Sequence, residues 1–435
     1  MIPTPQEMSA AAPELGLDVA QVKSLSSQID VAKFPAVYAA CTVAQLVLGQ
    51  VQVDTVPLNQ TVVDGNWSEA CVASPSCIVQ PRSAKDVALA LKIIKLFQVK
   101  FAVRSGGHSP NPGWSSIDSR GILIDMSKLN GISVSRNGPS SVVSVVLDGQ
   151  CVFVIGGCIP DVGVGGLILG GGYFHISPNF GLAANVNNFE VVTADRQFIN
   201  ANAKQNSDLF WALKGGRPNF GIITRFNLNT VLDAFGEWQK NGASDPKSNI
   251  ALVIGLDAIT VGLIYAEPPA PPAIFEHDYR AFSSRIDTEL TKKMYSFWVE
   301  KALAVRESTG AVQTFVLQHI GPALVQYGAQ RGGNPLGIPS IPQQWWTTLI
   351  DWQDAADDDI VRSVSIETTK RWASLAADSG CQIPFLYIND ASRDQNPLNS
   401  YGPANLAKLR KVAAKYDPEQ MFQKLQNGGF LLSKA

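Results

Sequence analysis

Apolar side chains recur at two spacings early in the chain, and each spacing predicts a different element. Over residues 87–97 they lie three or four positions apart, the spacing that gives a helix one buried face. Ser83, followed three residues later by Asp86, is typical of a helix N-terminus. A short apolar stretch over residues 101–103 then stops at Arg104. The pattern predicts a helix that runs directly into a buried strand.

Similar patterns predict the rest of the first half. Strands are expected at residues 122–124, 141–147, 189–192 and 222–228, a short helix at 207–214 with Trp211 on its buried side, and another short helix at 19–31.

From about Thr230 the pattern changes to mixed strands and long helices. Strands are expected at residues 251–254, 261–265 and 384–388, and helices at 289–306, 357–377, 403–415 and 417–422. No internal repeat and no low-complexity tail interrupts the order. A glycine-rich first half and a mixed second half imply two lobes, with the C-terminal tail returning to the first.

Composition narrows the class of protein. The 435 residues are 46% hydrophobic and 17% charged, with 36 Gly and 26 Pro, which is typical of a globular chain and excludes a disordered or collagen-like one. Thirty-five basic and 37 acidic residues give no field for nucleic acid or a membrane surface. No apolar run is long enough for a transmembrane helix. These features favour an enzyme or binding protein for a small molecule.

Cysteines and sequons point toward the secretory pathway. Cys41, Cys71 and Cys77 lie close together, and the sequons at Asn59 and Asn66 fall inside the same stretch, a combination that favours an oxidising compartment. The pairing of these cysteines stays open. The first residues show no signal peptide, so the alternatives are a mature secreted form and an intracellular protein.

Three glycine clusters supply the candidate binding elements: residues 104–110, 162–172 and 215–221. Adjacent glycines permit positive φ and expose backbone N–H groups, which is how a turn holds a pyrophosphate. The middle cluster has so many glycines that a flat or bulky group is expected to approach its backbone closely. It is not a Rossmann fingerprint, because Ile168 stands where the third glycine belongs, and no cluster has the lysine of a P-loop.

His108 is the histidine with the most suggestive position. A lone histidine is by default structural, but His108 follows a Gly-Gly turn at the end of a strand, where side chains often carry chemistry. His175, His277 and His319 have no such context. No spacing of histidines and cysteines suggests a metal site.

Several longer motifs occur in a fixed order along the chain: Arg104-Ser-Gly-Gly-His108, Asp161-Val-Gly-Val-Gly-Gly166, Phe189-Glu-Val-Val192, Leu209-Phe-Trp-Ala-Leu-Lys-Gly-Gly216, Tyr401-Gly402, Asn405-Leu406 and Tyr416-Asp417-Pro418. Together they resemble the FAD-linked oxidases of the vanillyl-alcohol-oxidase type, and most closely the branch of fungal enzymes similar to berberine bridge enzyme. The similarity runs from about Cys41 through Phe226 and resumes from Tyr387 to Leu432.

This resemblance implies an α+β fold of two lobes. After an N-terminal extension (1–34), an FAD-binding domain of the PCMH type would cover 35–230 and be completed by 400–435. A substrate-binding domain would cover 231–399 and close over the flavin.

The resemblance also assigns the cofactor site. His108 would bond to the flavin 8α-methyl group, the Gly106-Gly107 turn would hold the pyrophosphate, and the glycines from Gly163 to Gly172 would pass along the ring system. The expected cofactor-binding residues are Arg104, Ser105, Gly106, Gly107, His108, Ser109, Asp161, Val162, Gly163, Gly165, Gly166, Gly171, Gly172, Val186 and Ile222.

Some relatives carry a second link to flavin through a cysteine just before the proline of the middle motif. Here Ile159 precedes Pro160, and Cys158 is one position earlier. In an extended segment successive side chains point to opposite faces, so we expect a single covalent link, through His108.

Three departures from the family pattern lie near the expected flavin site. Residues 147–155 replace a longer segment that carries a helix, and Asn185-Val186 follows one residue early. Arg217 stands where a third glycine is common. If that position is left-handed, a residue other than glycine costs about 1–2 kcal/mol.

The leading hypothesis is an oxidase that moves a hydride from an alcohol, an amine or another secondary metabolite to covalently bound FAD, with O₂ as the acceptor. The resemblance places residues 385–389 beside the flavin. Tyr387 is the first candidate for the base, and Asn389 and Tyr401 are candidate orienting groups. A tyrosine base would need its pKa, ordinarily about 10, to be lowered.

Two alternatives belong to other classes: a non-redox protein that guides a cyclisation, and a paralogue that has lost flavin. No nucleic acid, membrane or metal partner is expected, and the sequence indicates neither the substrate nor the oligomeric state.

Overall fold

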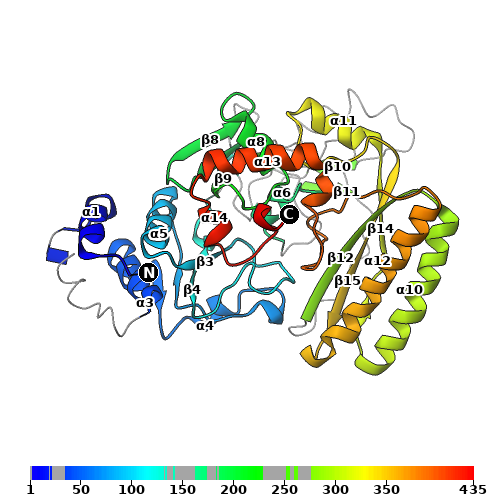
Figure 1. Ribbon diagram of the computed structural model, residues 1–435, viewed down its shortest axis with the longest axis horizontal. Helices are drawn as coiled ribbons and strands as arrows, with labels where there is room; N and C mark the ends of the chain where they lie inside the picture. The colour runs from blue at the N-terminus through cyan, green and yellow to red at the C-terminus, as the bar shows by residue number, and fades with distance from the viewer. Residues whose placement is uncertain are drawn as a thin grey trace.

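A computed structural model describes residues 2–18, 20–21, 35–131, 133–134, 141–142, 162–173, 183, 186–228, 251–254, 259–262 and 276–435. Figure 1 shows two lobes of mixed helix and sheet, with the N-terminal half on the left and a helix-covered sheet on the right. The expected α+β fold is confirmed.

The first sheet has the order β1-β2-β4-β3 and holds the strand that leads to His108. Strands β2 (Cys77–Val79) and β3 (Lys100–Arg104) flank β4 (Gly121–Asp125) in parallel, and β1 (Val53–Thr55) pairs antiparallel with β2. The predicted helix is α5 (Ala84–Phe97), whose apolar face is fully buried. The Ser83 side chain caps it by accepting a hydrogen bond from the Asp86 N–H.

The second sheet is antiparallel, with the order β5-β6-β9-β7-β8. Its strands are β5 (Ser133–Val134), β6 (Ser141–Val142), β7 (Val186–Val192), β8 (Phe198–Asn202) and β9 (Ile222–Leu228). Between the last two strands lies α8 (Ser207–Leu213), with Trp211 buried as predicted. The glycine-rich α6 (Val164–Leu169) precedes β7.

The right-hand lobe is built on β12 (Glu276–Arg285) and β15 (Gln343–Trp352), which pair antiparallel over ten residues each. Helices α10 (Thr288–Thr309) and α12 (Asp358–Asp378) lie side by side along this sheet (Figure 1). They bury Phe282, Trp346 and Trp372 in a common core. Because side chains alternate along a strand, the other face presents His277, Tyr279 and Trp345.

Smaller elements complete this half of the chain: β10 (Ala251–Ile254) with β11 (Ile259–Gly262), β13 (Val312–Gln313), β14 (Val316–Ile320) and α11 (Pro322–Gln330). The remaining short helices are α4 (Gln60–Val63), η1 (Glu69–Cys71), η2 (Met126–Lys128), η3 (Ala355–Asp357), η4 (Asn399–Tyr401) and η5 (Leu432–Lys434).

The last segment of the chain packs against the first lobe. Helix α13 (Pro403–Tyr416) lies beside α8 (Figure 1), and α14 (Met421–Lys424) begins where the Asp417 carboxylate accepts hydrogen bonds from two N–H groups. Beyond α14, the Phe101 N–H donates to the Leu425 carbonyl at 3.0 Å, and the Asn427 N–H donates to the Phe101 carbonyl at 2.7 Å. The strand that leads to His108 is therefore flanked by the chain's final residues.

Several predicted elements differ from the structure. The strand expected at 384–388 does not form: Pro384 lacks an N–H group, the Leu386 N–H donates to the Ser400 hydroxyl, and only Gln382 makes a single bridge, to Ser284. Helix α1 (Pro5–Leu15) was not predicted. The helix expected at 19–31 lies almost wholly outside the described residues, as does most of the strand expected at 141–147.

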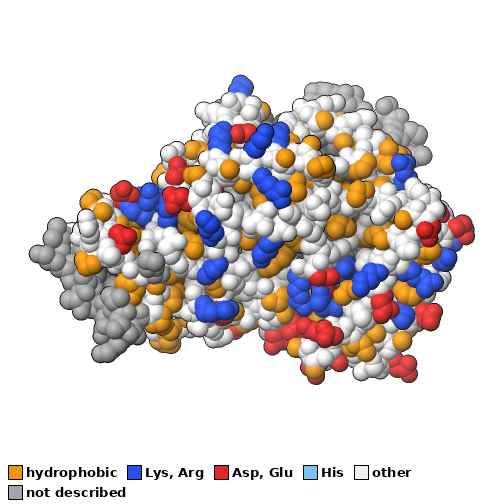
Figure 2. All heavy atoms as spheres, in the orientation of Figure 1, with side chains coloured by type: hydrophobic (Ala, Val, Ile, Leu, Met, Phe, Trp, Pro, Cys, Tyr) orange, Lys and Arg blue, Asp and Glu red, His pale blue; other side chains and the backbone are white. Residues whose placement is uncertain are grey.

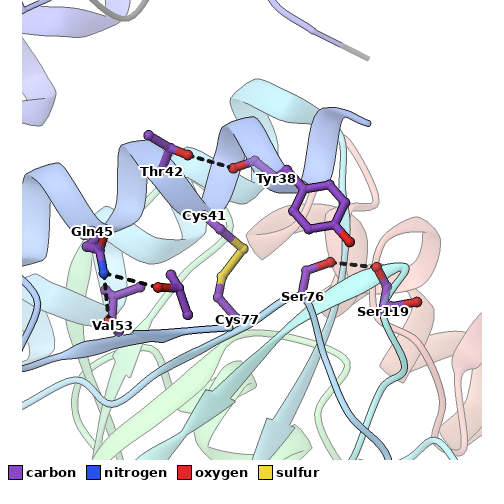
Figure 3. The surroundings of a disulfide bond; sticks show 9 residues. Tyr38, Cys41, Thr42, Gln45, Val53, Ser76, Cys77 and Ser119 are labelled. Atoms are coloured by element: carbon purple, nitrogen blue, oxygen red, sulfur yellow. Dashed lines mark hydrogen bonds between the residues drawn. A yellow bond between two sulfur atoms is a disulfide. The ribbon is translucent and has the colours of Figure 1, made fainter. Parts of the chain in front are cut away.

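The open question of cysteine pairing is answered by a disulfide between Cys41, on α3 (Ala36–Leu48), and Cys77, at the start of β2 (Figure 3). Their Cα atoms are 5.9 Å apart. Cys71 is a buried free thiol whose S–H donates to the Ser109 carbonyl at 3.0 Å. Cys381 is also free, and Cys151 and Cys158 lie outside the described residues.

The face drawn in Figure 2 mixes basic, acidic and apolar side chains, with the acidic ones densest toward its lower right. This dispersion agrees with a net charge of −2. None of the described helices combines the length and the apolar character needed to cross a bilayer.

Candidate active site

A buried ion pair supports the turn that follows β3. The Arg104 guanidinium donates to the Asp125 carboxylate at 2.7 Å and to the Val62 carbonyl at 2.5 Å, and both charged side chains are at most 5% exposed. Gly107 has φ +69°, and a Cβ there would collide with the Gly65 carbonyl. Buried Arg104 therefore fixes the base of the turn, and Gly107 permits its close packing.

The backbone at Ser105 and Gly106 is exposed and faces the glycine run. A Cβ on Gly163 would fall 2.5 Å from the Gly106 nitrogen, and one on Gly165 would fall 2.8 Å from the Ser105 hydroxyl. Gly166 is exposed, with nothing within 4 Å of a Cβ. The structure thus brings the first two glycine clusters together.

The far end of the run reaches the late segment of the chain. A Cβ on Gly170 would collide with the Asn389 side chain, and one on Gly171 would lie 3.1 Å from Leu336 and 3.6 Å from Tyr387. Gly171 and Gly172 have φ of +106° and +63°, which side chains other than glycine rarely adopt. The glycines therefore let the chain pass closely between the turn after β3 and residues 387–389.

His108 lies where the two lobes meet. Its Nε2 is 3.1 Å from the Tyr279 hydroxyl on β12. The ring of Trp67 stacks on His108, with centroids 4.1 Å apart, and also on His277, at 3.7 Å. His277 in turn contacts the Asp351 carboxylate at 2.6 Å. Sequence reasoning gave His277 no role, because only the fold brings it to His108.

A second link between the lobes lies nearby. The Ala70 N–H donates to the Glu276 carboxylate at 3.1 Å. Burial is the main cause that raises the pKa of the Glu276 carboxyl, and the Asp358 carboxylate raises it further. Burial also raises the pKa of the Cys71 thiol to about 12, so this thiol is not a nucleophile at neutral pH.

Tyr387, Asn389 and Arg217 form one polar network. The Asn389 amide donates to the Tyr387 hydroxyl at 2.8 Å and to the Leu167 carbonyl at 3.0 Å. The Arg217 guanidinium donates to the Asn389 side-chain oxygen at 2.6 Å and to the Ile388 carbonyl at 3.0 Å. These contacts fasten the late segment to the glycine run and to the third glycine cluster.

Tyr387 is protonated at neutral pH. Burial is the main cause that raises its pKa above the ordinary value, and the Asp390 carboxylate raises it further. Its oxygen accepts hydrogen bonds from Asn389 and, at 2.8 Å, from the Tyr173 N–H. The Trp345 ring stacks on it, with centroids 5.0 Å apart.

Tyr401 occupies a different place. Its hydroxyl donates to the Gly215 carbonyl at 2.9 Å, and burial raises its pKa. It anchors the third glycine cluster instead of pointing to the Tyr387 hydroxyl. Its assignment as an orienting group stays a prediction.

Asp390 is a residue that sequence reasoning missed. It is partly exposed, and its N–H donates to the Tyr387 carbonyl at 3.1 Å, which closes a turn. Burial raises the pKa of its carboxyl to about 7, against a smaller lowering by Arg217. The available signal was an acidic residue directly after the Tyr387-Ile-Asn389 motif.

The remaining predicted residues have less direct positions. Val186 begins β7 and Ile222 begins β9, and both are buried among core side chains. Ser109 accepts the Cys71 hydrogen bond, and Val162 directly precedes the glycine run. Asp161 lies outside the described residues. No group of three or more His, Cys, Asp or Glu side chains suited to a metal ion occurs in the described part of the chain.

The comparisons with known proteins agree on one cofactor. Residues 75–202 match a family model described as an FAD binding domain. An FAD-dependent monooxygenase from Arthrobotrys oligospora is 33% identical over 431 residues, covering 85% of this chain and 84% of the relative.

Solved structures share the fold at lower identity. A xylooligosaccharide oxidase from Myceliophthora thermophila, solved with xylobiose, superposes with a TM-score of 0.68 at 18% identity, covering 91% of this chain and 100% of that one. A glucooligosaccharide oxidase from Acremonium strictum, described with 6-S-cysteinyl, 8α-N1-histidyl FAD, gives a TM-score of 0.61 at 19% identity, covering 84% and 94%.

Proposed function

Because the chain belongs to the FAD-linked oxidoreductases of the vanillyl-alcohol-oxidase type, in the fungal branch similar to berberine bridge enzyme, we propose that it oxidises a small secondary metabolite with FAD held covalently on His108. The observation that carries this proposal is the position of His108. It follows an exposed Ser105-Gly106 turn that faces the glycine run, at the junction with the sheet of the second lobe.

The residues present fit the cofactor. The cradle between Ser105-Gly106 and Gly163 is one that a single Cβ would fill, and exposed backbone N–H groups in such a turn suit a pyrophosphate. When bound, FAD supplies a two-electron acceptor for a hydride. The turn would hold the phosphates, and Tyr279 and Trp67 would fix the His108 ring in one orientation. A histidine-linked FAD is described for the Acremonium strictum oxidase, which supports the covalent link.

Replacing His108 tests the link. In His108→Ala, flavin is expected to stay in the supernatant after acid precipitation, whereas wild-type flavin is expected to precipitate with the protein. His319→Asn is a matched control, because His319 is exposed on β14. Wild-type protein that never contains flavin, or a His108→Ala protein whose flavin still resists denaturation, contradicts the proposal.

The substrate is proposed as a small alcohol, an amine or another secondary metabolite, and O₂ as the acceptor. Tyr279, a partly exposed residue on the sheet of the second lobe, lies beside His108 and Trp67, and aromatic side chains suit contact with a compact organic molecule. Peroxide release over a panel of alcohols, amines and oligosaccharides tests this class. A flavoprotein that is not bleached by any member without O₂ would favour the non-redox alternative.

Passage through the secretory pathway is a further part of the proposal. The Cys41–Cys77 disulfide and the exposed Asn59 support it, because disulfides persist in oxidising compartments. Of the two sequons, only Asn59 suits a glycan, since the Asn66 amide nitrogen and the Ser68 side chain are buried. A shift in mass on endoglycosidase treatment, absent in Asn59→Gln, is expected. Glycosylation at Asn66 alone contradicts this assignment.

A further inference from the structure

We propose that the carboxylate of Asp390 is the base that takes the substrate's proton, an assignment that rests on the proposed function. Tyr387 would then orient the substrate instead of accepting its proton.

The backbone around Asp390 is fixed in place. The Asp390 N–H closes a turn onto the Tyr387 carbonyl, and the neighbouring Asn389 side chain contacts the Leu167 carbonyl on the glycine run. Arg217 holds Asn389 and the Ile388 carbonyl from the other side. A catalytic side chain needs such a rigid base, because small displacements of a proton acceptor are costly.

Asp390 differs from the other acidic residues of this region in its partners. Asp278 accepts from Arg362 at 2.8 Å, and Asp394 accepts from both Arg280 and Arg362. No ion pair or side-chain hydrogen bond joins Asp390 to another described residue. A carboxylate that is kept partly buried without a partner is destabilising, and such groups concentrate at functional sites.

The charges around Asp390 suit a base that works near neutral pH. Arg217 is the cation that acts on it, while the phenols of Tyr279 and Tyr387 are held neutral, in part by the Asp390 charge. Two further titratable groups surround Tyr279: the Asp351 carboxylate, which raises the pKa of its phenol, and His108, which contacts its hydroxyl. With a pKa of about 7, the carboxylate forms as the pH rises through neutrality, which is the range that favours general-base catalysis.

The proposed step is balanced. The substrate's C–H hydrogen leaves with its electron pair as a hydride that FAD takes up, the O–H or N–H proton passes to a carboxylate oxygen of Asp390, and a C=O or C=N bond forms. O₂ then takes up the two electrons and the proton of the hydride together with one proton from solvent, and becomes H₂O₂. Asp390 returns its proton to solvent.

The first experiment uses the holoenzyme without substrate. Because the folded carboxyl has a raised pKa, the wild type loses stability as the pH rises toward about 7. Asp390→Asn lacks this loss, so its melting temperature should exceed that of the wild type at pH 8, by a gap that shrinks toward pH 5. Asp378→Asn, at the exposed end of α12, is the matched control. A gap that does not change with pH overturns the proposal.

The second experiment measures flavin reduction and peroxide release with vanillyl alcohol and xylobiose as probes. We expect kcat/KM of the wild type to fall about tenfold per pH unit below pH 7, and Asp390→Asn to lose about 10²–10⁴-fold together with that pH dependence. Asp390→Glu should restore it, and Tyr387→Phe should keep it.

The outcomes separate the two proposals. A wild type that contains no flavin contradicts the proposed function. If neither probe reduces a bound flavin, a melting gap that does not change with pH still overturns the Asp390 proposal. A wild type that is active while Asp390→Asn keeps the same rate and pH profile removes Asp390 alone. Loss of the pH dependence in Tyr387→Phe, but not in Asp390→Asn, would return the role to Tyr387.

Discussion

Arg217 adopts a left-handed backbone conformation, with φ +60°, at a position where the family resemblance leads one to expect glycine. For a residue with a Cβ this costs about 1–2 kcal/mol. The guanidinium compensates by donating to the Ile388 carbonyl and to the Asn389 side chain, since hydrogen bonds from a charged group contribute about 1.5–3 kcal/mol each. Arg217 therefore has a strained backbone, and in return its hydrogen bonds hold residues 388 and 389 in place.

Two substitutions at Arg217 separate these effects. Arg217→Lys keeps the strain and loses the planar donor group, so we expect a loss of about 2 kcal/mol in the free energy of unfolding. Arg217→Gly also relieves the strain and should lose roughly 1 kcal/mol less than the lysine variant. Urea unfolding of the three proteins measures this order. A lysine variant as stable as the wild type would show that the hydrogen bonds contribute nothing.

At the scale of elements, the backbone of the glycine run (residues 163–172) approaches two other segments closely: the turn after β3 and residues 387–389. Gly163→Ala places a methyl group 2.5 Å from the Gly106 nitrogen, and overpacking of this kind costs about 1–3 kcal/mol. We expect lower stability and weaker flavin retention, measured by melting temperature and by the absorbance of the purified protein. Gly131→Ala is the matched control: it lies outside the glycine run, and its added methyl group meets nothing within 4 Å. Equal behaviour of the two variants contradicts this account.

Elements with a local signal were predicted well. Helix α5 has a capping serine and a regular apolar face, and β9 matches its predicted bounds. Helix α1 was missed although Thr4, which precedes Pro5, forms a capping box with Glu7 in the first turn. The strand expected at 384–388 failed because the apolar pattern does not reveal where each N–H group finds its acceptor. The pattern predicts burial, and the hydrogen-bond partners decide whether a strand forms.

The site was predictable to the extent that its residues form motifs. The turn before His108 and the middle glycines lie side by side in the structure, and their roles toward flavin stay predictions. The stacking of Trp67 on His108 and His277 joins residues far apart in sequence, and no spacing in one chain indicates such a contact. Asp390 was missed because its distinguishing feature is a carboxylate with no ion-pair or side-chain hydrogen-bond partner among the described residues. Only the folded structure reveals such a feature.

At the scale of the whole molecule, the disulfide joins α3 to the first sheet. Closing a loop of 36 residues should contribute roughly 3–4 kcal/mol by limiting the unfolded chain. We expect a reducing agent to lower the melting temperature of the wild type but not that of the Cys41→Ser, Cys77→Ser double variant. Cys381→Ser should behave as the wild type, since Cys381 is a free thiol. Equal sensitivity of the double variant would assign the effect to another pair.

One hydrophobic core spans both lobes and includes Ile168 from the first and Trp345 from the second, and polar and aromatic contacts join the lobes beside His108. Trp67 and the Ala70 N–H from one lobe engage His277 and Glu276 from the other. His108 and Tyr279 meet in the same place. The boundaries of the two domains, at residues 230 and 400, stay a prediction.

The return of the C-terminal segment to β3 has a consequence for synthesis on the ribosome. Lys100 and its acceptor, the carbonyl of Lys424, are 324 residues apart. At 5–20 residues per second, about 15–65 seconds pass between their translation. Throughout that interval the backbone of Phe101 lacks the hydrogen bonds that residues 425 and 427 later make to it. A message truncated before the codon of Lys424 would yield a polypeptide in which β3 lacks its partners from residues 424–427.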